Sequence, residues 1–363
     1  MAVKQPRPAP RPPSEGAAQP FVSVLVPCRN EERFIARCLD SILANDYPSA
    51  RWEVLVVDGG SDDRTRAIVA QYAACAPFVK LLDNPKRSFT AGVNTGIRAS
   101  YGEFVLIMGA HTSYERDYVS KCVKFARAYD VDNLGGVLVA TPLEDTDMAR
   151  AIALVLSHPF GAGNALFRIG SREPKEVDTV FGGCYRREVF QRIGLFDEDL
   201  PRSADLEFNM RLKRAGGTIL LVPEIVAYYH PKPNLSEFVM HAFDDGFWAI
   251  YPLRFGKRTF SWRHLIPLTF VASLIGSAAA TAFAPAFWGV LGSIAGAYAI
   301  LNVGYSARLA VRTHRFKNLW LLPVAFAARH VPYGVGSLVA LLRVLTSRAA
   351  WQSQMSTLHK PSR

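Results

Sequence analysis

Acidic residues are missing from the last third of the chain. None follows Asp245, whereas 13 Lys and Arg do; the part up to that residue holds the other 29 of 42 basic residues and all 31 acidic ones. The net charge of +11 therefore belongs to the C-terminal part, which is also apolar. A membrane surface with anionic lipids explains this combination better than nucleic acid, since no nucleic-acid-reading module precedes it. We therefore expect a membrane partner and no nucleic acid.

Cysteine is scarce and a secretory leader is not apparent. The five cysteines are odd in number and scattered singly, at Cys28, Cys38, Cys75, Cys122 and Cys184. This pattern predicts neither a disulfide framework nor a zinc site, and it favours a reducing compartment. Residues 1–20 are rich in Pro and Ala and lack an apolar segment, which predicts a disordered tail rather than a signal peptide. We therefore expect the following domain to lie in the cytoplasm.

Apolar runs of strand length alternate with helical patterns from residue 21 onward. The expected strands are 21–27, 52–58, 79–82, 104–108, 136–140 and 218–222, and the expected helices are 32–44, 63–74, 89–99, 116–129 and 204–215. Residues 158–180 are expected to be irregular. The early alternation is typical of an α/β fold with a Rossmann-like, mainly parallel sheet. We assign this domain to residues 21–232.

Polar side chains follow two of the expected strands. The strand at 52–58 ends in Asp58 and continues as DGGSDDRT (58–65), and the strand at 21–27 continues as PCRNEE (27–32). Ligands of open α/β sheets bind outside the carboxyl ends of the strands, so these two turns are expected to form one lip of a pocket. The two glycines at 59 and 60 do not fit the dinucleotide pattern G-x-G-x-x-G, which argues against a dinucleotide cofactor.

The C-terminal part, from residue 233 onward, has a sequence typical of a membrane region. Residues 233–264 interleave aromatic and basic side chains, as helices lying in a bilayer interface do; an ordinary amphipathic helix docked on the domain is the alternative. Residues 265–283 and 286–305 carry no charge and are long enough to span, so we expect a hairpin. Basic residues follow the second span and none lies in the connection, which places both ends in the cytoplasm.

A third apolar region, 319–342, is interrupted by Arg329, His330 and Pro332. If it spanned, the basic tail at 346–363 would lie outside, against the same charge rule. We therefore predict two short helices, re-entrant or interfacial, with one true span as the alternative. The whole region 265–345 is assigned to the membrane.

Three successive motifs give a resemblance to a known family. They are PCRNEE (27–32), DGGSDDRT (58–65) and NTGIRA (94–99), and they resemble those of family 2 inverting glycosyltransferases with a GT-A fold. Further motifs, DTVFGGCYRREVF (178–190), GLFDE (194–198), DLEFNMRL (205–212) and HVPYGVG (330–336), are similar to membrane-associated glycosyltransferases of the succinoglycan, exopolysaccharide type. The resemblance implies a hexosyltransferase that moves sugar, with inversion, from a nucleotide-sugar to a lipid-linked acceptor.

The resemblance also implies residue roles. Asp58 would contact the nucleobase, and the rest of the nucleotide site would come from Pro27, Arg29, Glu31 and Asn94. UDP-sugars are the favoured donors. A transfer directly onto polyprenyl phosphate is an alternative reaction.

Asp205 matches the catalytic base of this family. Inversion requires one carboxylate to take the proton of the acceptor hydroxyl while that oxygen attacks the anomeric carbon. Without the resemblance, an Asp at the start of a helix is expected to be an N-cap.

The chain departs from the family after the strand at 104–108. The family places Asp-x-Asp or Asp-x-His there to hold a divalent metal, Mg²⁺ or Mn²⁺, on the diphosphate; here the triplet is Gly109-Ala110-His111. Three explanations stay open. His111 holds a weakly bound metal; cations such as Lys86, Arg87 or Arg186 neutralise the leaving group; or transfer activity has been lost, leaving a membrane-bound nucleotide-sugar-binding protein.

Two adjacent acids lie beside the interfacial aromatic residues. Asp244 and Asp245, with Trp248, are candidate contacts to the acceptor sugar. A solvated helix end or an N-cap is the structural alternative for the two acids.

Overall fold

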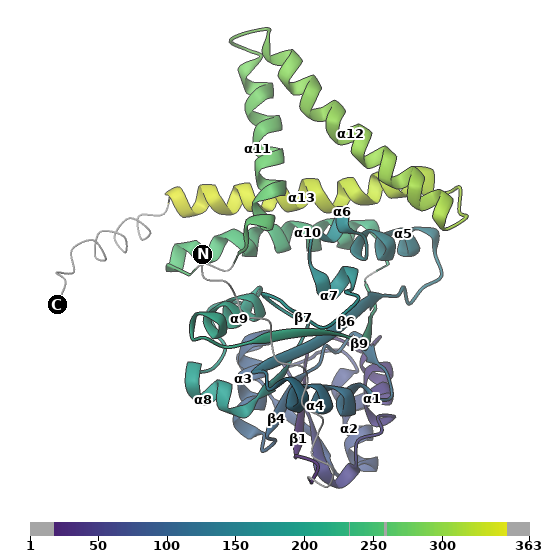
Figure 1. Cartoon of the computed structure of the whole chain (residues 1–363), viewed down its shortest axis with the longest axis vertical. Helices are drawn as coiled ribbons and strands as arrows, with labels where there is room; N and C mark the ends of the chain where they lie inside the picture. Colours follow the sequence, from purple (N-terminus) through teal and green to yellow (C-terminus); the bar gives the residue numbers. More distant parts are fainter. Residues whose placement is uncertain (1–17, 232, 258–259, 347–363) are drawn as a thin grey trace, which may run out of the picture. The chain divides into compact units, whose positions relative to one another are not determined.

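The computed structural model describes residues 18–231, 233–257 and 260–346, and these residues form two compact units (Figure 1). The first unit comprises residues up to 139, 170–201 and 208–229. The second comprises 140–169, 202–207 and the residues from 230 onward. Of the expected tails at 1–20 and 346–363, residues 1–17 and 347–363 lie outside the described residues.

The first unit contains one mixed sheet with the strand order β3-β2-β1-β4-β8-β6-β9-β5, and β7 pairs with β9. The strands are β1 (Val22–Cys28), β2 (Trp52–Asp58), β3 (Val79–Asp83), β4 (Phe104–Ile107), β5 (Thr112–Tyr114), β6 (Asn133–Ala140), β7 (Lys175–Glu176), β8 (Cys184–Arg186) and β9 (Ile219–Tyr229). β1 to β4 are parallel neighbours, whereas β8 runs antiparallel to β4 and β6, and β9 runs antiparallel to β5 and β7. The α/β class is confirmed. The antiparallel half was not expected, because β5 and β8 have three residues each and show no period in the sequence.

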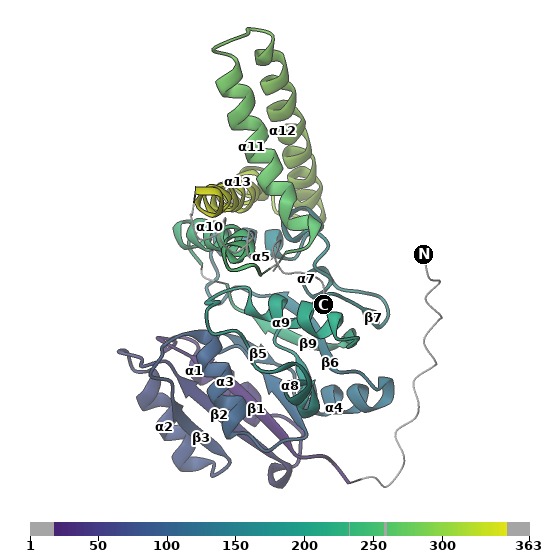
Figure 2. The ribbon, with the colours of Figure 1, turned by 90° about the vertical axis from the view of Figure 1, so that its left-hand side faces the viewer.

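Helices connect and cover these strands. They are α1 (Ile35–Leu43), the short 3₁₀ helix Ser49–Arg51, α2 (Thr65–Cys75), α3 (Phe89–Ala99), α4 (Tyr118–Tyr129) and α8 (Arg187–Ile193); α9 (Ala204–Arg214) begins in the second unit and continues in the first. Every residue of β1 and β2 is buried, which explains why their sequences are mostly apolar instead of alternating. The polar residues inside them, Ser23 and Glu53, are hydrogen-bonded to each other at 2.8 Å. α2 packs on β3 and α3 on β1 and β2 (Figure 2), so the loops at the carboxyl ends of these strands are held by a buried core.

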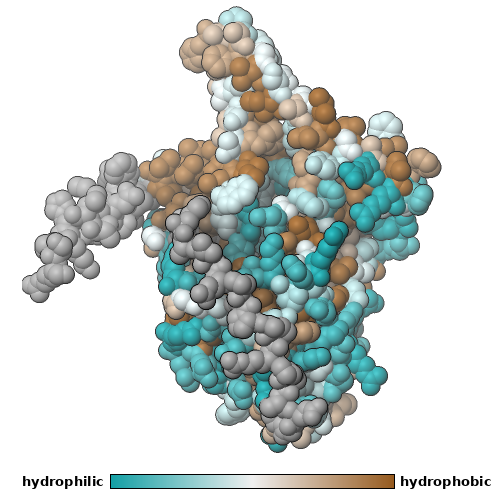
Figure 3. Space-filling model, viewed as in Figure 1, coloured by the Kyte–Doolittle hydropathy of each residue, from teal (hydrophilic) through white to brown (hydrophobic). Residues whose placement is uncertain are grey.

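The second unit is helical. Its elements are α5 (Asp147–Leu156), α6 (Pro159–Ala162), α7 (Leu166–Ile169), α10 (Leu235–Ile250), the 3₁₀ helices Tyr251–Phe255 and Trp262–His264, α11 (Leu265–Ala280), α12 (Phe287–Arg312) and α13 (Asn318–Thr346). α11 and α12 are the helices of the expected hairpin. Brown, hydrophobic patches lie beside pale residues on this hairpin in Figure 3, and α11, α12 and α13 are all long and apolar enough to cross a membrane.

The prediction of two short helices in the third apolar region is wrong, because α13 is one helix that continues through Pro323 and Pro332. The polar residues that we interpreted as an interruption have partners. Arg329 Nη1 lies 2.8 Å from Oδ2 of Asp245, and His330 Nε2 lies 2.7 Å from the carbonyl oxygen of Phe160. Paired polar groups cost far less than free ones in an apolar helix, so they do not end it.

α13 differs from the hairpin in its packing. It runs alongside α10 and across α11 and α12 (Figures 1 and 2). In its most apolar window 44% of the residues are buried, against 11% and 6% for the hairpin helices. A Cβ at Gly246 would lie 2.0 Å from the carbonyl oxygen of Tyr333, and one at Gly336 would lie 2.1 Å from that of Phe243. Only glycine therefore allows α10 and α13 to approach this closely.

Candidate functional site

The turns that follow β1 and β2 are hydrogen-bonded to each other. The amide of Asn30 donates to the hydroxyl of Ser61 at 2.8 Å, and the amide of Glu31 donates to that of Thr65 at 2.8 Å. In return, the amide of Asp62 donates to Oδ1 of Asn30 at 3.0 Å. The two strand ends thus form one continuous rim at the edge of the sheet, as the sequence predicts.

Asp58 is enclosed beneath this rim and has no exposed surface. Its Oδ2 accepts hydrogen bonds from the amides of Gly60 and Ser61, both at 3.0 Å, and from Nη1 of Arg66 at 2.8 Å. Arg66 also binds Asp83 at 2.7 Å. Burial alone would raise the pKa of Asp58, but the hydrogen bonds from Ser61 and Arg66 hold that pKa below its usual value. An ionised Asp58 therefore shapes the turn, and Arg66 lies over its outer side.

Two arginines flank the same turn. A Cβ at Gly59 would lie 3.3 Å from Cβ of Arg29, and a Cβ at Gly60 would lie 3.3 Å from Nε of Arg87. Both arginines are exposed, whereas Pro27 is buried at the end of β1. The rim therefore presents two guanidinium groups, which suit an anionic group such as a diphosphate.

His111 and Glu31 lie together at the end of β4. Nδ1 of His111 is 3.2 Å from Oε1 of Glu31. A Cβ at Gly109 would lie 3.2 Å from both Phe181 and Thr112, so a carboxylate there would displace its neighbours. Across residues 18–231, 233–257 and 260–346 no three His, Cys, Asp or Glu side chains gather where a metal could bind. One imidazole and one carboxylate are fewer protein ligands than a divalent-cation site of Asp-x-Asp type supplies, so these residues do not fit that metal site by themselves.

Asn94 and Lys86 meet at one carboxylate. Nδ2 of Asn94 donates to Oε1 of Glu198 and to the carbonyl of Phe196, both at 2.9 Å, while its Oδ1 accepts from the amide of Phe196 at 3.0 Å. Nζ of Lys86 lies 2.6 Å from Oε2 of Glu198. The hydrogen bond from Asn94, and then that from Lys86, lowers the pKa of Glu198. Asn94 is buried and its polar atoms are occupied, so the structure places it as a link between α3 and the 194–198 loop.

Arg186 lies at the wrong end of the sheet for the role that we predicted. It pairs with Phe104, the first residue of β4, whereas the rim lies beyond Ile107, the last one. Its guanidinium binds Asp130 at 2.8 Å and the carbonyl of Val131 at 2.9 Å. The short strand β8 reverses the chain direction, which the sequence did not reveal, and so Arg186 is removed from the diphosphate candidates.

Asp205 lies in the first turn of α9, among the residues of the second unit. It is exposed to solvent, and the protein nearby removes part of its hydration. This partial removal of water raises the pKa of Asp205; hydrogen bonds from backbone amides, including that of Leu206, oppose the rise, and the charge of Asp245 adds to it. An accessible carboxylate with a raised pKa has the properties of a general base.

Asp244 and Asp245 are not a solvated helix end, because both lie within α10 and both are ion-paired. Arg202 reaches Oδ2 of Asp244 at 3.2 Å and Oδ1 of Asp245 at 3.4 Å, and Arg329 reaches Asp245 at 2.8 Å. Trp248 packs edge-on against neighbouring aromatic rings of the same segment. The acids are therefore part of an ion cluster in the second unit.

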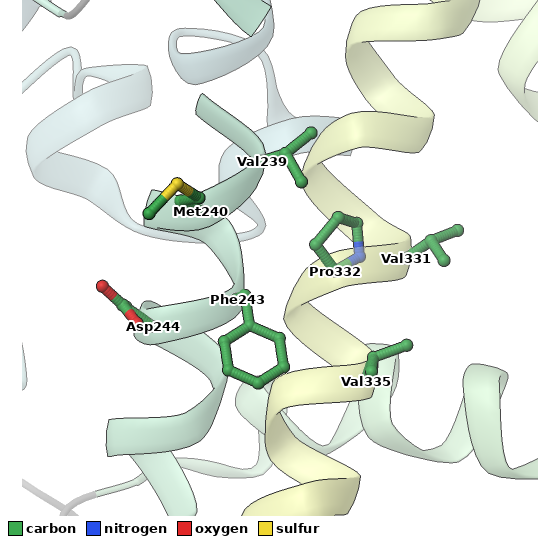
Figure 4. Close-up of a pocket in the computed structure, with 7 residues that line it drawn as sticks. All are labelled: Val239, Met240, Phe243, Asp244, Val331, Pro332 and Val335. Atoms are coloured by element: carbon green, nitrogen blue, oxygen red, sulfur yellow. The ribbon is translucent and has the colours of Figure 1, made fainter. Parts of the chain in front are cut away.

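An apolar groove runs between α10 and α13 next to this cluster (Figure 4). Its volume is about 380 Å³. The lining residues are Val239, Met240, Phe243 and Asp244 of α10 and Val331, Pro332 and Val335 of α13. Apart from Asp244 the lining is hydrophobic, so the groove suits a hydrocarbon chain with a polar group at one end.

Sequence reasoning missed three arginines of these sites: Arg66, Arg202 and Arg329. Arg66 and Arg202 gave no signal beyond their nearness to Asp58 and Asp205. Arg329 did, because a charge inside an apolar helix predicts an acidic partner, and the nearest acids of the C-terminal part are Asp244 and Asp245.

Comparison with known proteins agrees with this architecture. Residues 23–194 match the family described as Glycosyl transferase family 2. The chain is 27% identical, over 70% of its length and 80% of the relative, to the Methanococcus voltae dolichyl N-acetyl-alpha-D-glucosaminyl phosphate 3-beta-D-2,3-diacetamido-2,3-dideoxy-beta-D-glucuronosyltransferase. It is 28% identical, over 61% of its length and 67% of the relative, to the succinoglycan biosynthesis protein ExoA of Rhizobium meliloti (strain 1021).

A solved structure shares the fold. The mannosyltransferase PcManGT of Pyrobaculum calidifontis, in complex with GDP-Man and Mn²⁺, superposes with a TM-score of 0.53 over 90% of each chain at 22% identity. This likeness supports a GT-A-like α/β domain followed by helices. Residues 23–194 are therefore a glycosyl transferase family 2 domain.

Proposed function

We propose that this protein transfers a sugar, with inversion, from a nucleotide-sugar to a lipid-linked acceptor at the cytoplasmic face of a membrane. The observation that carries the proposal is Asp205, an accessible carboxylate in the first turn of α9, in a chain whose residues 23–194 match glycosyl transferase family 2. The relative from Methanococcus voltae, whose name includes a dolichyl-linked sugar phosphate, supports a lipid-linked acceptor. We place the hairpin α11–α12 across the bilayer and α10 and α13 along its cytoplasmic interface.

In this proposal Asp205 takes the proton of the acceptor hydroxyl as that oxygen attacks the anomeric carbon. The bond from the anomeric carbon to the nucleoside diphosphate breaks on the opposite face, which inverts the configuration. A UDP-sugar is the donor that we favour, bound at the rim that includes Arg29, Glu31 and the turn after Asp58. Arg66 covers Asp58, so contact of a base with that carboxylate requires Arg66 to move aside.

The leaving diphosphate gains negative charge, and cationic side chains can stabilise it. Arg29 and Arg87 flank the rim, and His111 lies near Glu31 at the end of β4. Lys86 is already paired with Glu198, and the carboxylate offsets the positive charge that Lys86 would present to the diphosphate.

The test is transfer by the full chain in nanodiscs, with a panel of UDP-, GDP- and dTDP-sugars and a polyprenyl-diphosphate glycan. Asp205→Asn should lower kcat by about 10² to 10⁴, the usual contribution of a general base, while the affinity for the nucleotide stays unchanged. Product mass separates transfer onto a glycan from transfer onto polyprenyl phosphate. Wild-type activity retained in Asp205→Asn would contradict the assignment of the base.

A second candidate is nucleotide-sugar binding without transfer. Gly109, which replaces the carboxylate of the family motif, favours it. This second candidate predicts that calorimetry detects binding of a nucleotide. It also predicts that no donor on the panel is turned over, with or without Mn²⁺. Turnover that is lost in Asp205→Asn would exclude it.

A further inference from the structure

Asp245 occupies the centre of an ion cluster in the second unit. Nη1 of Arg329, on α13, lies 2.8 Å from its Oδ2. Nη1 of Arg202 lies 3.4 Å and Nε2 of His241 lies 3.7 Å from its Oδ1. One carboxylate therefore connects α10, α13 and the segment that precedes α9.

Arg202 ties the start of α9 into this cluster. It lies three residues before Asp205, and its second guanidinium nitrogen lies 3.2 Å from Oδ2 of Asp244. Between Arg202 and the helix, Ser203 has a φ of +58°, in the left-handed region that non-glycine residues rarely adopt. Residues 202–207 belong to the same compact unit as α10 and α13. Ion pairs with α10 thus hold a strained backbone immediately before Asp205.

The other end of the cluster is equally fixed. α10 and α13 pack with their backbones in close approach at Gly246 and Gly336, and the hydroxyl of Ser337 donates to the carbonyl of Gly246 at 2.9 Å. Asp245 directly precedes Gly246, so its position is set by the tightest part of this helix pair. Arg329 comes from the same packed stretch of α13.

The charges of the cluster act on Asp205 as well. Titratable and charged groups from four segments surround Asp205 and Asp245. They are Arg168 of α7; Arg202, which precedes α9; His241 and Asp244 of α10; and Arg329 and Tyr333 of α13. Asp245 tends to raise the pKa of His241, but loss of water and the charges of Arg202, Arg329 and Arg168 outweigh it and lower that pKa. Burial likewise tends to raise the pKa of Asp245, and the neighbouring His241, Arg329 and Arg202 lower it below its usual value. Asp245 is therefore an ionised neighbour of Asp205.

We propose that Asp245 is a positioning residue for Asp205, holding the start of α9 through Arg202 while Arg329 of α13 holds Asp245 itself. The inference rests on the proposed role of Asp205 as the base. It makes the helices that follow the sheet domain part of the catalytic apparatus, because the base is fixed by α10 and α13. The negative charge of Asp245 also keeps Asp205 a stronger base than an isolated carboxylate.

The test uses the full chain in nanodiscs and the pH dependence of kcat. Asp245→Asn should lower kcat about tenfold to a hundredfold through misplacement of the base, leave the donor KM unchanged, and move the acid limb of the profile to lower pH. Arg329→Gln should move the acid limb to higher pH, because it leaves Asp245 less neutralised. Asp147→Asn, which removes a carboxylate paired with Arg150 and Lys317 elsewhere in this unit, is the matched control and should behave as wild type.

A wild-type profile in Asp245→Asn would overturn the proposal. So would a fall in kcat with an unmoved acid limb, since a merely structural residue would produce that result.

A second measurement separates this inference from the proposed function. The Asp205 carboxyl can be titrated by ¹³C NMR without substrate, its signal being assigned by its loss in Asp205→Asn. The signal should titrate at lower pH in Asp245→Asn than in wild type. If wild type transfers no sugar, the proposed function fails while this shift still decides the positioning role; an unmoved signal overturns the positioning role even in an active enzyme.

Discussion

Nδ1 of His111 lies 3.2 Å from Oε1 of Glu31, so a residue expected at the diphosphate contacts one expected at the nucleotide. β1 and β4 are adjacent parallel strands, and their carboxyl ends bring the two side chains together. The contact gives His111 a fixed orientation at the end of β4 even though the neighbouring carboxylate of the family motif is replaced by Gly109.

We expect His111→Ala to raise the donor KM about tenfold to a hundredfold, because a hydrogen bond to a charged group is worth about 1.5–3 kcal/mol. His111→Gln keeps a side-chain donor and should recover part of this loss. Steady-state kinetics with varied nucleotide-sugar, in chelator and in Mn²⁺, provides the measurement. Arg37→Gln, an exposed change on α1, is the control. A donor KM equal to that of wild type in His111→Ala would remove His111 from the site.

Asp205 should make the protein less stable at neutral pH than a neutral residue would. Its pKa is raised in the folded state, so the protonated form is the one that folding favours. The stability that the protonated carboxyl contributes is fully present below its pKa in the unfolded chain, about 3.9. It is lost as pH rises through the higher pKa of the folded state. Asp205→Asn should therefore raise Tm at pH 7, and the difference from wild type should vanish below about pH 4. Thermal unfolding across pH 4–8 tests this prediction; Asp147→Asn should not raise Tm, and an equal or lower Tm for Asp205→Asn at pH 7 would refute it.

Substitution of Asn94 distinguishes a structural role of this residue from a nucleotide-binding role. Asn94→Ala removes hydrogen bonds to both backbone groups of Phe196 and to Glu198. Leaving buried polar groups without partners costs about 1–3 kcal/mol each, so we expect a clearly lower Tm. The donor KM of the remaining folded protein should stay within about twofold, well below the effect of losing a hydrogen bond to a charged group. Thr95→Ala, at the next position of α3, is the comparison; a large rise in donor KM with an unchanged Tm would restore the nucleotide role.

The groove between α10 and α13 should bind the lipid chain of the acceptor. Val335→Trp fills part of the 380 Å³ and should raise the KM for long-chain polyprenyl acceptors while leaving short-chain, water-soluble analogues unaffected. Transfer assays with acceptors of several chain lengths give the measurement. Val324→Trp introduces the same side chain at an exposed position of α13 outside the groove lining and should show no dependence on chain length. Equal effects on long and short acceptors would argue against the groove.

Local sequence patterns were sufficient for much of the first unit and for the hairpin. Continuous apolar runs predicted the buried parallel strands β1 and β2, since both faces of these strands are covered, and the helix expected at residues 89–99 has those limits as α3. The uncharged lengths of α11 and α12 predicted two helices because spanning length is a local property. The polar turns at 27–32 and 58–65 pointed to the rim because parallel strands end at one edge.

Contacts between distant segments could be decided only by the tertiary structure. The reversal of the chain at β8 moved Arg186 to the far end of β4, and packing against α10 and Phe160 carried α13 through Arg329, His330 and Pro332 as one helix. The same holds for the enclosure of Asp58 by Arg66 and the ion pairs of Asp245. Residue type and spacing along the chain determine which side chains can ionise, bind or span. Which of them neutralise one another depends on through-space distances of a few ångströms, and those are set by the fold.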